Sequence, residues 1–207
     1  MPNGRNRQIC LAHHPTGFPT EDNFALSETA VPEPKEGEIL CRTIYLSLDP
    51  YMRGRMNPGP SYAPGVELGH VMGGATVSQV VQSRLPHYDE GDLVLSANGW
   101  QEFALSDGEG VRKLDPTIAP ISTALGVLGM PGHTAYVGLL DHGRPKAGET
   151  VVVSAASGAV GAIVGQLAKL EGCRVVGIAG RQEKCDYVVS ELGFDVCVSH
   201  HRDDLSE

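Results

Sequence analysis

The sequence has 207 residues, a formal net charge of −9 and 20% charged residues, which suits a soluble protein of two modest domains. The acidic balance argues against nucleic-acid binding, and no apolar run reaches the roughly 18 residues of a membrane span. The N-terminus lacks the apolar core, about 7 to 15 residues long, of a secretory signal. Five cysteines are scattered singly along the chain. An odd number without a signal peptide predicts reduced thiols and a cytoplasmic protein.

Short strand patterns, separated by loops rich in proline and glycine, fill the first half of the sequence. No helical pattern lies between them, so they favour a small barrel or sandwich. The predicted strands are 8–12, 24–28, 38–48, 69–81, 90–95 and 100–105.

The period of the apolar residues changes near Pro116. Two short helices are predicted at 118–130 and 134–140, separated by Pro131 and Gly132. The predicted elements that follow are strand 150–153, a helix from 161, strand 174–179, helix 183–192 and strand 195–199. This alternation predicts a parallel sheet with right-handed crossovers, and therefore an α/β domain over 121–207 after a β-rich domain over 1–120. Since a full dinucleotide-binding sheet has about six strands, we expect the sequence to be part of a longer protein, or its missing half to be supplied otherwise.

The turn between the first strand and helix of the second half carries the spacing Ala156-x-Gly158-x-x-Gly161. This is the dinucleotide-binding fingerprint with its first glycine replaced by alanine. A side chain on Gly158 would keep a pyrophosphate from the amides at the helix start, and Gly161 would allow close packing of the helix. Such turns also occur for packing alone, but the strand, helix and strand around this one favour nucleotide binding.

The end of the following strand discriminates between cofactors. Proteins that select NAD usually carry Asp or Glu there, about 20 residues after the glycines. This sequence instead continues with Gly180 and Arg181, and Lys184 follows. Positive charge at this point suits a 2'-phosphate, so the sequence favours NADPH. The alternative is that Arg181 and Lys184 are solvated residues of a first helical turn, although cations are unfavourable there without an anion.

Tyr51 and Tyr62 lie in surroundings rich in proline and glycine, which predicts exposed loops. A tyrosine hydroxyl can donate a hydrogen bond to a developing enolate oxygen, although the residues alone favour tyrosines that anchor their loops. The eight histidines form no H-E-x-x-H pattern and the cysteines form no C-x-x-C pair. No metal site is therefore predicted.

Four stretches, 45–56, 125–140, 155–161 and 180–184, closely resemble the zinc-independent medium-chain reductases, in the same order along the chain. The resemblance is nearest to the bacterial curcumin reductase branch, which is related to the leukotriene and prostaglandin reductases. It implies a GroES-like catalytic barrel followed by the first part of an NADPH-binding Rossmann domain. It also implies reduction of the carbon–carbon double bond of an α,β-unsaturated ketone or aldehyde.

The resemblance assigns roles to individual residues. Tyr62 and Tyr51 match family tyrosines that face the substrate, where hydride reaches the β-carbon, hydrogen bonds hold the enolate and a proton returns to the α-carbon. His200 aligns with a tyrosine that contacts the adenosine phosphate in many relatives. The expected NADPH contacts are Gly158, Ala159, Val160 and Gly161 for the pyrophosphate, Gly180, Arg181 and Lys184 for the 2'-phosphate, and Thr134 for the nicotinamide end.

Relatives in this family are much longer than this sequence. Their additional residues supply the rest of the Rossmann sheet, further nicotinamide contacts and usually a homodimer interface. Two other functions remain open at this point: a quinone reductase, and a truncated, non-catalytic polypeptide that binds a nucleotide.

Overall fold

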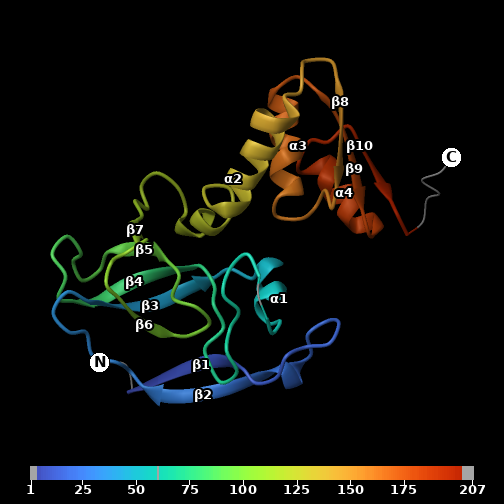
Figure 1. The fold of residues 1–207 in the computed structure, drawn as a ribbon. Helices are drawn as coiled ribbons and strands as arrows, with labels where there is room; N and C mark the ends of the chain where they lie inside the picture. Colours follow the sequence, from blue (N-terminus) through green and yellow to red (C-terminus); the bar gives the residue numbers. More distant parts are fainter. Residues whose placement is uncertain (1–3, 60, 202–207) are drawn as a thin grey trace. The chain divides into compact units, whose positions relative to one another are not determined.

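The computed structural model describes residues 4–59 and 61–201, and the chain divides into two compact units, Met1–Leu125 and Gly126–Glu207 (Figure 1). The first unit consists mainly of antiparallel strands, and the second alternates parallel strands with helices. The predicted fold class, α/β with a β-rich N-terminal domain, is confirmed.

The first unit contains two antiparallel sheets. One is the pair β1–β2, and the other has five strands in the order β6-β3-β4-β5-β7. Ile39, Cys41, Val80 and Val94 pack together as one apolar core of this unit. The bounds of the strands are β1 Arg5–Leu11, β2 Phe24–Ala30, β3 Ile39–Leu46, β4 Thr76–Ser83, β5 Leu93–Ser96, β6 Phe103–Ser106 and β7 Arg112–Lys113.

The predicted strand at 69–81 is wrong in its first half, because β4 begins only at Thr76. Gly69 has a φ of 81°, which is outside strand geometry. Gly74 lies so close to its neighbours that a Cβ there would be 2.9 Å from the Cε atom of Met52. This close approach, rather than strand geometry, explains why residue 74 is glycine.

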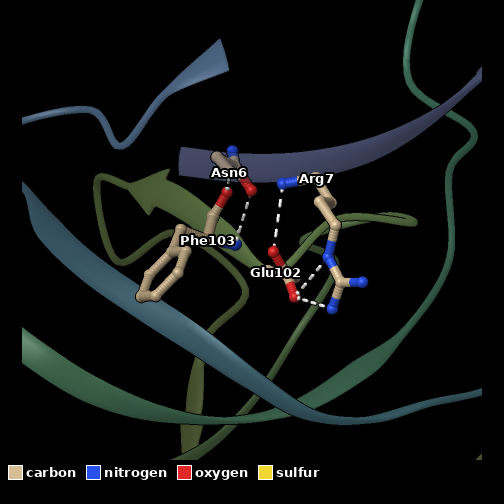
Figure 2. A network of polar contacts seen from close by, with 4 residues as sticks. All are labelled: Asn6, Arg7, Glu102 and Phe103. Carbon is tan, nitrogen blue, oxygen red and sulfur yellow. Dashed lines mark hydrogen bonds and ion pairs between the residues drawn. The ribbon is translucent and has the colours of Figure 1, made fainter. Parts of the chain in front are cut away.

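Strand β1 is tied to β6 by side chains that reach across to the backbone (Figure 2). The buried Asn6 amide donates to the Phe103 carbonyl at 2.9 Å, and its oxygen accepts from the Phe103 amide at 2.9 Å. Next to it, the Glu102 carboxylate accepts hydrogen bonds from the backbone amide of Arg7 at 3.1 Å and from its Nε at 2.9 Å. Asn6 therefore pairs two backbone groups that would otherwise be buried without partners.

A short helix, α1 (Tyr51–Arg55), lies between β3 and β4 in sequence and starts after Pro50, whose fixed φ suits a helix start. Met52 and Met56 point into a second apolar core with Leu11 and Met72. Tyr51 packs against this core and is half-buried. The prediction of an exposed loop at Tyr51 was therefore wrong. A single turn of 3-10 helix, Glu21–Asn23, precedes β2.

The second unit is a parallel sheet of three strands in the order β10-β9-β8, as the alternating pattern predicted. Its core includes Val153, Val175, Val188 and Phe194. The Phe194 ring packs directly on α3 at Gly165, where a Cβ would be 1.9 Å from the ring. The bounds are β8 Thr150–Ser154, α3 Gly161–Leu170, β9 Arg174–Ala179, α4 Gln182–Ser190 and β10 Val196–Ser199.

Pro131 and Gly132 do not separate two helices, contrary to the prediction. They lie in the first turn of α2 (Met130–Tyr136), where proline loses no intrahelical hydrogen bond. A Cβ on Gly132 would lie 1.8 Å from the Val127 carbonyl oxygen, so this glycine permits a tight entry into the helix. The helix continues as a π-helix, η3 (Val137–Gly143), and a short 3-10 helix, η2 (Ile121–Leu125), ends the first unit.

No helix within the described residues is long and apolar enough to cross a membrane.

Candidate functional site

Backbone contacts within the turn between β8 and α3 fix its conformation. Ala155 has a left-handed φ of 48°, and its carbonyl accepts a hydrogen bond from the Gly158 amide at 2.8 Å. A Cβ on Gly161 would lie 2.4 Å from the same carbonyl oxygen. Because that oxygen belongs to the backbone, it could not move aside without changing the turn. Gly161 is therefore a steric requirement of this turn.

Ala156 occupies the position of the first glycine in the fingerprint. It is fully buried, and its amide donates to the Ile178 carbonyl of β9 at 3.0 Å. The facing residue of β9 is Gly177, where a Cβ would come within 3.0 Å of the Ala156 methyl carbon. The glycine in β9 thus provides the space that the alanine occupies, and the departure from the fingerprint leaves the turn intact.

The start of α3 has backbone amides that the helix itself does not pair. The helical ladder begins with Ala162 donating to Gly158 and Val164 donating to Val160, both at 2.9 Å. Within residues 4–59 and 61–201, the amides of Ala159, Val160 and Gly161 have no acceptor. Unpaired amides at the positive end of a helix dipole bind anions, so this turn fits a pyrophosphate.

A pocket of about 670 Å³ lies next to this turn in the second unit. Its walls come from the turn after β8, from the loop between β9 and the start of α4, and from the end of β10. Four of the residues predicted to bind the cofactor line it together: Gly158, Gly180, Lys184 and His200. The other lining residues are Ala155, Ser157, Ala179, Glu183, Tyr187 and His201.

Two histidines form one side of this pocket at the end of β10. The His200 amide donates to the Ala179 carbonyl at 3.0 Å, which fixes the chain where it leaves the sheet. The rings of His200 and His201 lie 4.3 Å apart, centre to centre. A Cβ on Gly180 would be 3.4 Å from His201 Nε2, so the glycine leaves room for both rings.

Lys184 is the exposed lysine of the pocket, and it has no ion-pair partner in the part of the chain that the structure describes. Strand β9 ends at Ala179 and is followed by Gly180 and Arg181, so no carboxylate stands directly at the strand end. Glu183 is the carboxylate that lines the pocket. An unpaired ammonium group, in a pocket next to a helix start with unpaired amides, fits the 2'-phosphate of NADPH.

Several predicted residues lie outside the pocket lining. Arg181 is the N-terminal cap of α4, and its carbonyl accepts from the Lys184 amide at 3.1 Å. Thr134 lies on α2, and its hydroxyl donates to the Met130 carbonyl of the same helix at 2.8 Å. The lining also omits Ala159, Val160 and Gly161, whose amides are described above.

The lining residues that were not predicted from the sequence include Tyr187 and His201. Tyr187 follows Lys184 by three positions, a spacing that brings two residues to one helix face. That spacing was a usable signal. His201 simply follows His200, and nothing in the sequence distinguished it from an ordinary surface histidine.

The two predicted catalytic tyrosines belong to the first unit, where they meet around Arg55. The guanidinium carbon lies 5.8 Å from the centre of the Tyr51 ring and 5.3 Å from that of Tyr62. Tyr62 is 82% exposed. Burial, followed by the charge of Asp49, raises the pKa of Tyr51, so its hydroxyl remains protonated at neutral pH and can donate a hydrogen bond.

A family model described as the N-terminal domain of oxidoreductases matches residues 7–114, more than half of the chain. The chain belongs to the zinc-independent medium-chain dehydrogenase/reductase family, as its four motifs predicted. The two units accordingly correspond to a GroES-like domain and to the first strands of a Rossmann domain.

Particular members of this family are highly similar to the chain. The NADPH-dependent curcumin reductase of Escherichia coli (strain K12) is 57% identical over 203 residues, which cover 98% of this chain and 59% of that protein. Prostaglandin reductase 1 of Rattus norvegicus is 47% identical over 193 residues, covering 92% of this chain and 56% of that protein.

Among solved structures, CurA from Vibrio vulnificus in complex with NADPH superposes with a TM-score of 0.91 at 54% identity. The match covers 96% of this chain and 59% of that one. The chain thus spans less than two thirds of the length of these relatives.

Proposed function

We propose that the full-length protein is an NADPH-dependent reductase of the carbon–carbon double bond of α,β-unsaturated ketones and aldehydes. The observation that carries this proposal is the pocket of the second unit. There, the unpaired Lys184 and two histidines lie beside a helix start whose amides have no acceptor in the described chain. The similarity to a curcumin reductase and a prostaglandin reductase, both from this family, supports the choice of substrate class.

The chain offers a distinct set of groups for each part of the cofactor. In this proposal the amides of Ala159, Val160 and Gly161, with Gly158 leaving room for the approach, hold the pyrophosphate. NADPH, when bound, supplies the hydride. The 2'-phosphate is held by Lys184, His200 and Arg181 next to Gly180, and Thr134 lies toward the nicotinamide end.

The tyrosines of the first unit act on the substrate in this proposal. Reduction of an enone places negative charge on the carbonyl oxygen, and hydrogen-bond donors aimed at that oxygen stabilise the charge. Tyr62 and Tyr51 are the proposed donors. The raised pKa of Tyr51 suits a donor better than a base, because the hydroxyl keeps its proton.

The test is NADPH consumption by the full-length protein with benzylideneacetone and with cinnamaldehyde. We expect oxidation of NADPH and a product in which the double bond is saturated and the carbonyl is retained. The saturated ketone benzylacetone is the matched control and should not react. Absence of turnover with every enone, enal and quinone would contradict the proposal.

Two further outcomes of this assay would indicate a different function. A faster reaction with menadione than with the enones would identify a quinone reductase. Binding of NADPH without any turnover would identify a nucleotide-binding polypeptide that is not catalytic.

We also infer that the full-length protein is a cytoplasmic homodimer. The five cysteines are all free thiols, which suits a reducing compartment. The resemblance to the family supports the dimer. Sedimentation of the full-length protein should give twice the monomer mass, and a monomeric mass would refute the dimer.

A further inference from the structure

Arg55 occupies an unusual position for a charged residue of the first unit. It is half-buried in α1, and its guanidinium lies within 6 Å of the ring centres of both Tyr51 and Tyr62, at 5.8 and 5.3 Å. Its Nη1 donates to the Pro64 carbonyl at 2.6 Å. In the described chain no carboxylate forms an ion pair with it. Its electrostatic partners are therefore one carbonyl and two aromatic faces.

The backbone around Tyr62 also returns to Arg55. The Val66 amide donates to the Arg55 carbonyl at 2.8 Å, and a Cβ on Gly65 would lie 3.3 Å from the same oxygen. The segment 61–66 has no helix or strand of its own. Tyr62 itself forms no hydrogen bond within residues 4–59 and 61–201, and the Arg55 guanidinium lies 5.3 Å from the centre of its ring.

We propose that Arg55 is a positioning residue that fixes the Tyr62 ring near Tyr51, so that both hydroxyls can serve one substrate oxygen. This inference rests on the proposed role of the two tyrosines in enone reduction. A guanidinium is well suited to the task, because its flat, weakly hydrated cation stacks on aromatic faces while its N–H groups still bond a carbonyl. The same charge opposes the rise that burial causes in the pKa of Tyr51.

A double-mutant cycle in the full-length protein tests the coupling between Arg55 and Tyr62. Arg55→Met should lower kcat/KM for benzylideneacetone by about tenfold, which corresponds to the loss of two cation–ring contacts. Arg55→Lys should recover only part of that loss, because it keeps the cation but lacks the flat guanidinium. In a Tyr62→Ala background, Arg55→Met should cost less than about threefold.

The control is Arg5→Gln. Arg5 is an exposed arginine that forms an ion pair with Glu28, and both residues are distant in sequence from the two tyrosines. This substitution should leave kcat/KM unchanged. An equal loss from Arg55→Met with and without the Tyr62 ring would overturn the inference, because a general structural role acts regardless of Tyr62. Thermal unfolding of each variant shows whether it folds.

Fluorine NMR of protein that carries fluorotyrosine separates this inference from the proposed function, because it requires no turnover. The Tyr51 and Tyr62 resonances, assigned by single Tyr→Phe variants, should shift in Arg55→Met and stay in place in Arg5→Gln. Unchanged resonances in Arg55→Met would overturn the positioning role even in an active reductase. Shifted resonances in a protein without enone turnover would support the positioning and refute only the proposed reaction.

Discussion

The turn after β8 and the tyrosine pair of the first unit are two ways of building a site. In the turn, the backbone provides the functional groups, and glycine is required because a Cβ on Gly161 would meet a backbone oxygen at 2.4 Å. In the proposed site around Tyr51 and Tyr62, side chains provide the functional groups, and the guanidinium of a third side chain, Arg55, lies within 6 Å of both ring centres.

The difference explains which of the two sites the sequence reveals. A backbone site restricts which residues fit, so its constraints are visible as glycines at fixed spacing. A site made of side chains in an irregular segment imposes no fixed spacing, so the sequence shows only which residue types are present. Substitutions of the glycines in the turn after β8 should therefore act through steric fit, whereas those around the two tyrosines should act through individual polar or aromatic contacts.

The largest effect is expected from Gly161→Ala in the turn. The added methyl group would force the backbone at Ala155 to move, which should lower the free energy of unfolding by about 1–3 kcal/mol and abolish measurable NADPH binding. Gly138→Ala is the matched control, because a Cβ there meets nothing within 4 Å. Calorimetric titration and thermal unfolding measure both effects. Normal NADPH binding by Gly161→Ala would show that the turn does not require glycine at this position.

Lys184→Ala measures how much one side chain contributes to NADPH binding at a site in which backbone amides hold the pyrophosphate. Loss of one charged contact should weaken NADPH binding by about tenfold to a hundredfold. Binding of NADH should not change, because NADH lacks the 2'-phosphate. Lys146→Ala, an exposed lysine of the same unit, serves as the control. Equal losses for the two nucleotides would argue against a 2'-phosphate contact at Lys184.

Asn6→Ala tests the dependence of the first unit on individual polar side chains. The substitution leaves the amide and carbonyl of Phe103 without their partner in a buried position, which should cost about 1–3 kcal/mol of unfolding free energy. Chemical denaturation measures this cost. Arg5→Gln, in an exposed ion pair, should cost less than about 1 kcal/mol. Similar values for the two variants would contradict the importance of the buried link.

The smallest effect is expected from the neighbouring Glu102. Hydrogen bonds from Arg7 hold the pKa of Glu102 below its ordinary value of 4.5. Its contribution to stability is therefore present above that ordinary value and is lost as the pH falls through the lower, folded-state pKa. The melting temperature of Glu102→Gln should be slightly below that of the wild type near neutral pH, and the difference should disappear once the pH has fallen below the folded-state pKa of Glu102. A difference that is independent of pH would show that the carboxylate charge contributes nothing.

The regular elements of both units could largely be predicted, because alternation and helical spacing reflect burial on one face. β9 matches its predicted range, and the parallel order of the second unit follows from strands alternating with helices. The helix at Tyr51 and the entry of α2 through Pro131 could not be predicted. Both depend on what proline does at a helix start, which looks the same in the sequence as proline in a loop.

The candidate sites divide in the same way. Gly158, Gly180, Lys184 and His200 were identified in the sequence, and the structure places them around one pocket. Arg55 was not identified. Its importance depends on distances to two rings, one of them in a segment without regular structure, and no spacing rule encodes such a contact.

The most direct test of the central claim is a titration of isotope-labelled protein with adenosine 2',5'-bisphosphate, followed by the backbone amide resonances. The ligand carries the 2'-phosphate and one phosphate of the pyrophosphate but no nicotinamide, so it probes the pocket of the second unit alone. We expect saturable shifts of the amide resonances of Ala159, Val160, Gly161, Lys184 and His200. At the same concentration, 5'-AMP, which lacks the 2'-phosphate, should cause no shift near Lys184. Binding that leaves these amides unchanged, or no binding, would contradict the claim that the turn and the start of α4 form an NADPH site.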